Sequence, residues 1–436
     1  MSDTPEAQEQ VKIDRIHTFD LLRGGAIIGI LVFHRVLWDY FFSSYTGGAI
    51  PPEIGVMYLF ITMAGIFYVI SGAVNAYMIQ KRLTLKRISA RVLVAGGWIT
   101  GILMLLYSLA FRVLLLRFID DSMPLVQMDD SLINLTGILP YYLMFGRLPD
   151  PAINPASFIG METLGMIGVT IIFVSTLMGA ISKWKGLEYP RIVYGTLASL
   201  GLFFLAVSPF LRFAIGEFSN NAFHSGNYLV AFFLEPLVNG MMPIFPHLSY
   251  GCFGAMVGVA IARNENPRKV LGYTVIFAAI ALVIGAIYMG NIDALPGQEP
   301  FTWAANINLL ARKLLQLGFF FILIFLGLAL LDYRSASTRE RWSRLAQMVP
   351  DFGKLALTVY MLEGLVAVVL QLIVAPIWPQ WNATLVNIIL FGLLNILVWS
   401  IILVLWEKAE YKGSMEWCLV WVVQKLSGKK SSRFRD

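Results

Sequence analysis

The sequence predicts an all-α, polytopic integral membrane protein with about ten transmembrane helices plus one re-entrant or interfacial segment. Hydrophobic residues make up 58% of the 436 residues and charged residues only 14%, whereas soluble domains carry about 25% charged residues. Long apolar runs recur along the chain, and a helix that crosses a bilayer needs about 20 such residues. The aromatic content of 13% excludes an intrinsically disordered chain.

Ten apolar runs are long enough to span a bilayer. The run at 132–146 is shorter than a span and is expected to enter or line the membrane without crossing it. The stretches 119–158 and 215–243 are rich in Pro, Asn and aromatic residues, and we expect them to form an external lid or acceptor-binding elements. The predicted spans cover residues 19–42, 54–80, 88–118, 159–181, 192–214, 244–262, 268–290, 308–331, 355–377 and 383–406.

The distribution of Lys and Arg predicts the orientation of these helices. If the N-terminus is cytoplasmic and 132–146 does not cross, most of the 33 basic residues fall in cytoplasmic loops, as the positive-inside rule requires. We therefore expect a multi-pass cell-membrane protein with cytoplasmic termini. It would comprise a tail at 1–17, a transmembrane domain at 18–407 and a basic tail at 408–436 that contacts anionic lipids.

Other partners and bound groups are limited by composition. The net charge of +6 follows from topology, so no nucleic-acid partner is expected. The polar, acidic N-terminus lacks the features of a cleaved signal peptide. Cys252 and Cys418 form no disulfide framework or metal motif, and no metal ligand set with a recognised spacing is present.

The first predicted helix contains the most informative stretch, RIHTFDLLRGGAIIGILVFHRVLWDY. Arg23 and His34 are eleven residues apart, which is about three helical turns and roughly 16 Å, so both lie on nearly one face. Ionisable residues inside a span are functional candidates. Arg23 would hold an anion near the cytoplasmic side, and His34 would do proton or acyl chemistry deeper in. Alternatively, Arg23 obeys the charge rule and His34 bonds a backbone carbonyl. Arg35 is expected to snorkel or to contact another helix.

The second predicted helix carries GIFYVISGAVNAYMIQ and leads into a basic turn, KRLTLKRISAR. Five cations within eleven positions suit a polyphosphate, but basic cytoplasmic loops are also an ordinary feature of membrane proteins. Ser71 and Gly72 can equally serve as small residues that let helices approach closely. No Walker-type loop is present. The five cations are Lys81, Arg82, Lys86, Arg87 and Arg91.

Together these motifs resemble the membrane-bound acyltransferase family 3. That family carries Arg, ten residues and His in its first helix, a Phe-Phe-x-x-Ser-Gly-like motif matched here by FYVISG, and a basic turn. Its late Gly-x-x-Ser-x-x-x-Tyr-Leu-x-His pattern is similar to GKLALTVYMLEG, where Glu363 replaces His. Its Trp-x-x-x-x-Glu motif is matched loosely at Glu162.

Two further stretches, FPHLSYGCFGAMVGVAIAR and WEKAEYKGSMEWCLVW, look similar to the heparan-α-glucosaminide N-acetyltransferase-like branch of the wider superfamily. The active histidine of that branch lies in the first external loop. The corresponding loop here, SSYTGG, contains no histidine. His34 is therefore the better candidate.

The resemblance implies transfer of an acyl group, expected to be acetyl, from cytoplasmic acyl-CoA to a hydroxyl or amine of an extracytoplasmic glycan or lipid-linked acceptor. Acyl-CoA would be a substrate, with no tightly bound cofactor. His34 would act as a base or carry the acyl group, and Glu363 or Glu162 would orient it or accept its proton. The implied donor-binding residues are Arg23, Ser71, Arg82, Lys86, Arg87 and Arg91.

Alternatives stay open at this level. A proton-coupled transporter or flippase would use His34 and intramembrane carboxylates as a relay, and a silent scaffold would use neither. Each of Glu162, Glu235 and Glu363 can instead form a helix–helix hydrogen bond. We expect His247 at the membrane interface or at a helix cap, and His224 in an external loop.

Overall fold

Helices are the only regular secondary structure in the described part of this computed structural model. The structure describes residues 16–41, 64–84, 89–116, 137–149, 153, 155–184, 186–239, 242–290, 301–334 and 348–427. The prediction of an all-α, polytopic membrane protein is confirmed, since eight of the described helices are long and apolar enough to cross a membrane.

The first half of the chain begins with α1 and the turn of π-helix η1 that continues it. The 3₁₀ turns η5 and η6 lie on either side of α7. The bounds are α1 His17–Arg35, η1 Val36–Phe41, α4 Gly65–Thr84, α5 Ala90–Ala110, η3 Phe111–Leu115, α6 Ile138–Phe145, η5 Pro155–Phe158, α7 Thr163–Lys183 and η6 Gly186–Glu188.

The second half contains the longest helix, α8, and ends in a short helix after the last apolar span. The bounds are α8 Pro190–His224, α9 Tyr228–Val238, α10 Ile244–Ala262, α11 Pro267–Gly290, α12 Trp303–Gly327, η7 Leu328–Asp332, α14 Met348–Lys354, α15 Ala356–Val374, α16 Leu385–Lys408 and α17 Met415–Ser427.

The two motif-bearing helices differ from the other predicted spans. Helices α1 and α4 form where the sequence predicts them, but neither is among the eight strongly apolar candidates. Their polar residues lower the apolar character of both helices, and most of α4 is buried inside the protein. A helix enclosed by protein exposes little surface to lipid, so it can cross a membrane without being strongly apolar along its length.

The segment 132–146 behaves as expected where it is described. Helix α6 has eight residues, a rise of only about 12 Å, which is too short to cross a bilayer. The backbone amide of Gly137 donates to the carbonyl of Leu116 at 2.5 Å, so α6 starts beside the end of η3.

The irregular backbone expected at 215–243 is wrong for its described residues. Helix α8 continues to His224, ten residues past the expected end, and α9 follows. Two polar side chains, Arg212 and Asn239, are buried between these helices. Arg212 donates to the Val238 carbonyl at 3.1 Å, and Asn239 donates to the Gly216 carbonyl at 2.9 Å.

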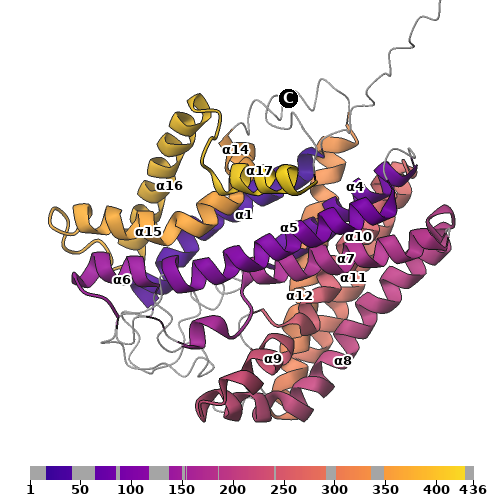
Figure 1. Ribbon diagram of the computed structural model, residues 1–436, viewed down its shortest axis with the longest axis horizontal. Coiled ribbons are helices and arrows are strands. Elements are labelled where there is room, and N and C mark those ends of the chain that lie inside the picture. Colours follow the sequence, from indigo (N-terminus) through magenta and orange to yellow (C-terminus); the bar gives the residue numbers. More distant parts are fainter. Residues whose placement is uncertain are drawn as a thin grey trace, which may run out of the picture.

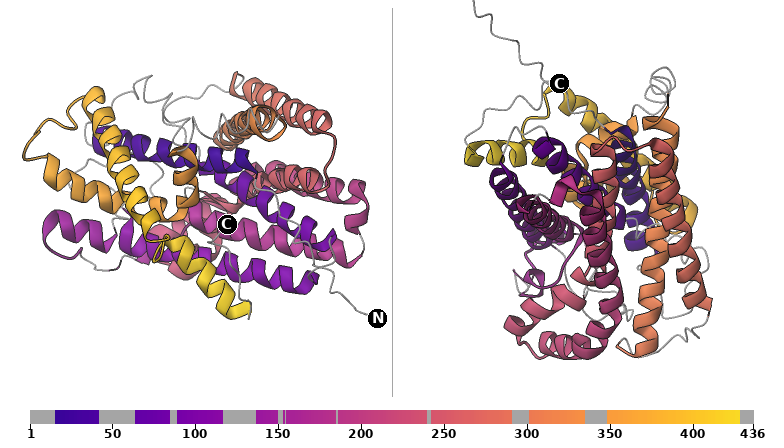
Figure 2. Two further views of the ribbon diagram at one scale, coloured as in Figure 1. Left: turned by 90° about the horizontal axis from the view of Figure 1, so that it is seen from above. Right: turned by 90° about the vertical axis from the view of Figure 1, so that its right-hand side faces the viewer.

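Helices α1, α15, α16 and α17 lie on one side of the molecule, and α8, α9, α11 and α12 lie on the other (Figure 1). Helices α11 and α12 pack as a pair at one edge (Figure 2). Between these groups, α4 packs tightly against α10. A Cβ added at Gly72 would lie 2.1 Å from the Gly251 carbonyl oxygen, and one at Gly254 would lie 2.0 Å from that of Val69. Small residues thus bring the two backbones together, as in many membrane helix pairs.

Candidate functional site

The structure brings His34 of α1 together with Glu363 of α15. His34 Nδ1 lies 2.8 Å from Glu363 Oε1. Because a carboxylate only accepts, this contact places the proton on Nδ1 and makes Nε2 the basic nitrogen of the neutral ring. The side chain of His34 is 19% exposed and that of Glu363 only 7%. The imidazole is therefore the more accessible partner, with a buried carboxylate behind it.

Arg35 extends this pair into a buried chain of charges. Its guanidinium donates through Nη2 to Glu363 Oε2 at 3.0 Å and through Nη1 to Asp39 Oδ2 at 2.9 Å. Arg35 is fully buried, so the snorkelling alternative is wrong and the interhelix contact is correct. The four side chains comprise two carboxylates, one guanidinium and one imidazole.

Helix α1 is fixed at its N-terminus by a residue from a distant part of the chain. Asp332, the last residue of η7, accepts hydrogen bonds from the backbone amides of His17 at 3.0 Å and Thr18 at 2.9 Å. This satisfies donors that a helix N-terminus leaves without intrahelical partners. On another face, a Cβ at Gly24 would lie 1.8 Å from the Val349 carbonyl oxygen. The close approach of α14 to Gly24 brings Lys354 to the same side as Arg23.

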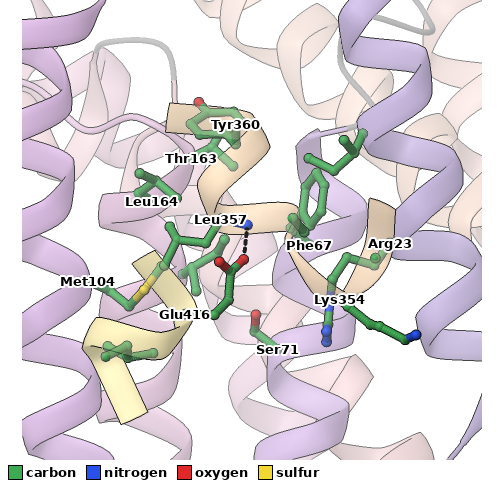
Figure 3. Close-up of a pocket in the computed structure, with 15 residues that line it drawn as sticks. Arg23, Phe67, Ser71, Met104, Thr163, Leu164, Lys354, Leu357, Tyr360 and Glu416 are labelled. Atoms are coloured by element: carbon green, nitrogen blue, oxygen red, sulfur yellow. Dashed lines mark hydrogen bonds between the residues drawn. The ribbon is translucent and has the colours of Figure 1, made fainter. Parts of the chain in front are cut away.

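A cavity of about 220 Å³ lies between α1, α4, α7, α15 and α17. Arg23 and Lys354 lie together on one side of it, and Glu416 and Ser71 lie across from them (Figure 3). Most of the wall is apolar. The lining residues are Arg23, Ile27, Phe67, Ser71, Met104, Thr163, Leu164, Ile167, Gly353, Lys354, Ala356, Leu357, Tyr360, Glu416 and Leu419.

The cavity lies along the same two helices as the His34–Glu363 pair. On α15, Glu363 follows the lining residue Tyr360 by three positions, a rise of about 4.5 Å. On α1, His34 follows the lining residue Ile27 by seven positions, a rise of about 10 Å. Arg23 and Lys354 therefore line the cavity, and the imidazole lies farther along the helices. This is the order that the spacing of Arg23 and His34 predicts.

Glu416 of α17 binds the N-terminus of α15. It accepts hydrogen bonds from the backbone amide of Leu357 at 2.6 Å and that of Thr358 at 3.2 Å, and a short one from the Thr358 hydroxyl. These are amides that a helix start leaves unpaired. Part of the segment predicted as a basic tail thus forms a helix that closes one wall of the cavity.

Burial raises the pKa of Glu416 above its ordinary value of 4.5, although the hydrogen bonds from Thr358 and Leu357 oppose this. The folded protein therefore binds this proton more tightly than the unfolded chain. The contribution of this proton to the folding stability is fully present below about pH 4.5 and is lost as the pH rises through the raised pKa.

We expect the Tm of the purified protein to fall as the pH rises from about 4.5 through the raised pKa of Glu416, and to fall less in Glu416→Gln. Glu410→Gln, at an exposed position, is the control and should behave as wild type. Equal pH profiles for all three proteins would contradict the expectation.

The described contacts of Glu162 do not support the sequence hypothesis that this carboxylate orients His34. It is the N-cap of α7 and accepts from the backbone amides of Leu164 at 2.8 Å and Gly165 at 3.1 Å. The Tyr360 hydroxyl donates to its Oε2 at 3.1 Å. No described contact joins Glu162 to His34, whereas Glu363 makes that contact directly. The geometry supports a capping role for Glu162, linked to the cavity through Tyr360.

The predicted donor-binding residues separate into two groups. Arg23 and Ser71 line the cavity, whereas Arg82 and Arg91 do not. Arg82 follows Ser71 by eleven positions, about 16 Å along α4, and Arg91 is exposed at the start of α5. Lys86 and Arg87 fall outside the described residues. Gly72 packs against α10, as the close-approach reading expects, and Ser71 lines the cavity.

Sequence reasoning missed Lys354 and Glu416 as cavity residues and underrated Arg35. The sequence could have indicated that Arg35 is paired, because an arginine after an apolar run is costly without a partner. Lys354 and Glu416 looked like ordinary residues of cytoplasmic segments. Only the fold brings them to Arg23. Among the described residues, no group of three or more His, Cys, Asp or Glu side chains is arranged to hold a metal ion.

Comparison of the chain with protein-family models and with curated protein sequences gave no match. The resemblance described above therefore rests on its motif residues alone.

Proposed function

We propose that this membrane protein transfers an acyl group from acyl-CoA to a hydroxyl or amine of a glycan or lipid-linked acceptor on the opposite side of the membrane. The observation that carries the proposal is the His34–Glu363 contact at 2.8 Å, beyond a cavity that contains Arg23 and Lys354. A positioned imidazole with a buried carboxylate is the usual arrangement of a general base.

The size of the cavity favours one part of the donor. Pockets that enclose whole drug-sized ligands measure about 300–1,000 Å³, and this cavity measures about 220 Å³. It suits the narrow pantetheine arm rather than a nucleotide. The nucleotide and its phosphates would then stay outside, where Arg82 and Arg91 lie, and Arg23 and Lys354 would pair with the phosphate nearest the arm.

The proposed chemistry balances without an oxidant or a metal. Nε2 of His34 takes the proton of the acceptor O–H or N–H as that atom attacks the thioester carbonyl carbon. A carbon–oxygen or carbon–nitrogen bond forms, the carbon–sulfur bond breaks, and the CoA thiolate takes the proton from the imidazolium. Glu363 holds Nδ1–H throughout and stabilises the imidazolium. In the second route, Nε2 attacks the carbonyl carbon itself, and the carbon–sulfur bond breaks to release the CoA thiolate. The acceptor O–H or N–H then attacks the acyl carbon, the carbon–nitrogen bond to His34 breaks, and the acceptor proton passes to the CoA thiolate.

Turnover of acyl-CoA tests the proposal. Purified protein in detergent would be given acetyl-CoA and a series of longer acyl-CoAs, and release of the CoA thiol would be measured. We expect slow release in wild type. Arg23→Gln and Lys354→Gln should raise KM about tenfold with a smaller effect on kcat, because they remove charge-assisted contacts to phosphate. Lys412→Gln, at an exposed position, is the matched control. Failure of both release and CoA binding in wild type would overturn the proposal.

A proton-coupled transporter is the second candidate, and the buried chain of His34, Glu363, Arg35 and Asp39 favours it. Intramembrane ionisable chains are typical of proton relays. Cleavage of the thioester in detergent distinguishes the two candidates. A transporter leaves the thioester intact, and its proton flux in liposomes requires His34. An acyltransferase releases CoA in detergent, where no gradient exists.

A further inference from the structure

Both oxygens of the Glu363 carboxylate are held by consecutive residues of α1. Oε1 lies 2.8 Å from His34 Nδ1, and Oε2 accepts from Arg35 Nη2 at 3.0 Å. Arg35 is fully buried, and only 7% of the Glu363 side chain is exposed. Breaking a buried ion pair is strongly destabilising. The carboxylate is therefore fixed in one orientation, with one oxygen for the imidazole and one for the guanidinium.

Asp39 of η1 holds the other end of the guanidinium. Its Oδ2 accepts from Arg35 Nη1 at 2.9 Å, and Asp39 is 7% exposed. Asn382 donates through Nδ2 to the backbone carbonyl of Asp39 at 3.0 Å, which joins η1 to the segment between α15 and α16. A planar guanidinium held at two nitrogens has little freedom to turn. Asp39 thus keeps Arg35 directed at Glu363.

The charge of Arg35 determines the protonation state of Glu363. A carboxyl group buried away from water is stable as the neutral acid unless a cation compensates its charge. Arginine is always protonated in proteins, so Arg35 keeps Glu363 ionised. Two further ionisable side chains face this carboxylate through described interactions: His34 contacts it directly, and Asp39 acts through Arg35. Tyr360, one turn earlier on α15, donates to a different carboxylate.

The protonation state of Glu363 in turn determines which nitrogen of His34 carries the proton. A carboxylate only accepts, so it takes Nδ1–H and leaves Nε2 as the basic nitrogen of the neutral ring. A neutral carboxylic acid would donate its O–H to Nδ1, and the ring proton would lie on Nε2. Nε2 could then neither take a proton from the acceptor nor attack a thioester. A 2.8 Å contact fits either arrangement, and the ion pair with Arg35 selects the first.

We propose that Arg35 is a positioning residue that sets the tautomer of His34 by keeping Glu363 ionised. Asp39 holds Arg35 in place for this role. The catalytic use of the tautomer rests on the proposed acyl transfer, because both routes need an unprotonated Nε2. The tautomer itself requires no substrate, so it can be measured in the resting protein.

Nitrogen NMR of the full-length protein, labelled with ¹⁵N-histidine and purified in detergent, measures the tautomer. The chain has four histidines, and the signal lost in His34→Ala assigns His34. His247 is the internal standard. Its Nδ1 lies 2.7 Å from the Pro243 carbonyl, which only accepts, so its neutral ring carries Nδ1–H. His247 is 1% exposed, so the expectation that it lies at the membrane interface is wrong.

In wild type, we expect His34 to pass from imidazolium to the Nδ1–H form as the pH rises, without a neutral Nε2–H form. Arg35→Gln should show the Nε2–H form, replaced by Nδ1–H at higher pH as Glu363 ionises. In the thiol-release assay, its kcat at neutral pH should fall at least about tenfold. KM should change little, because Arg35 does not line the cavity. The acid limb of the pH–rate profile should move to higher pH, since loss of a cation makes a proton harder to remove.

Further variants separate this role from a structural one. Arg35→Lys restores the charge and should keep the wild-type tautomer, which a merely structural role of the guanidinium would not predict. Arg263→Gln, at a partly exposed position, is the control and should match wild type in tautomer and rate. If Arg35→Gln does not fold, Arg35→Gln combined with Asp39→Asn removes the cation together with its second carboxylate, and should give the same Nε2–H form.

A neutral Nε2–H form of His34 in wild type would overturn the proposal. A folded Arg35→Gln variant, alone or with Asp39→Asn, that keeps the wild-type tautomer would overturn it as well. Failure of acyl transfer gives a different result. If wild type neither releases nor binds CoA while the tautomers are as expected, acyl transfer is excluded and the role of Arg35 at His34 stands.

Discussion

His34→Ala is expected to lower the rate of CoA release from acyl-CoA by about 10²–10⁴-fold, the range that a positioned general base contributes. The variant removes the side chain that takes the acceptor proton and returns it to the CoA thiolate in the proposed reaction. It should bind CoA as wild type does, because His34 does not line the cavity. The measurement is a thiol-release assay beside a CoA-binding titration.

Glu363→Gln provides the graded test of the same site. A glutamine can still accept from His34 Nδ1–H, but it lacks the charge that stabilises an imidazolium, so we expect a loss of at least about tenfold. Its pH–rate profile should shift, which a purely structural role would not produce. His224→Ala is the matched histidine control, since His224 is exposed at the end of α8. Equal rates for wild type, His34→Ala and His224→Ala would remove His34 from the mechanism.

Gly72→Leu is expected to destabilise the protein by about 3 kcal/mol or more, at the upper end of overpacking costs. The added Cβ meets the Gly251 carbonyl oxygen at 2.1 Å. That atom belongs to a helix backbone and cannot move aside as a flexible side chain can. The prediction is a large fall in Tm, or no monodisperse protein on size-exclusion chromatography in detergent.

Gly195→Leu is the matched control for this change. Gly195 also lies inside a helix, but nothing approaches within 4 Å of its added Cβ. Its replacement should be neutral or slightly stabilising, because leucine favours a helix over glycine by about 0.8 kcal/mol. Ser71→Ala should also fold normally, since Ser71 faces the cavity. A Gly72→Leu variant as stable as Gly195→Leu would contradict the close contact of α4 and α10.

Periodicity predicted the local arrangement of α1 well. Eleven residues between Arg23 and His34 imply one face and about 16 Å of separation, and the structure puts the first in the cavity and the second against Glu363. The limits of this reasoning appear at α8 and α9. Asn239 resembled a loop residue, because a sequence cannot show that its partner lies on the neighbouring helix.

The sequence by itself determined the class of fold, most of the apolar helices, and the pairing of Arg23 and His34 on one face of α1. These follow from composition and helical period, which are local properties of the chain. The tertiary structure decided that Glu363 rather than Glu162 meets His34, that Arg35 is fully buried, and that Lys354 and Glu416 reach the cavity. Each of these depends on a contact between residues far apart in sequence, where packing of whole helices sets the distance.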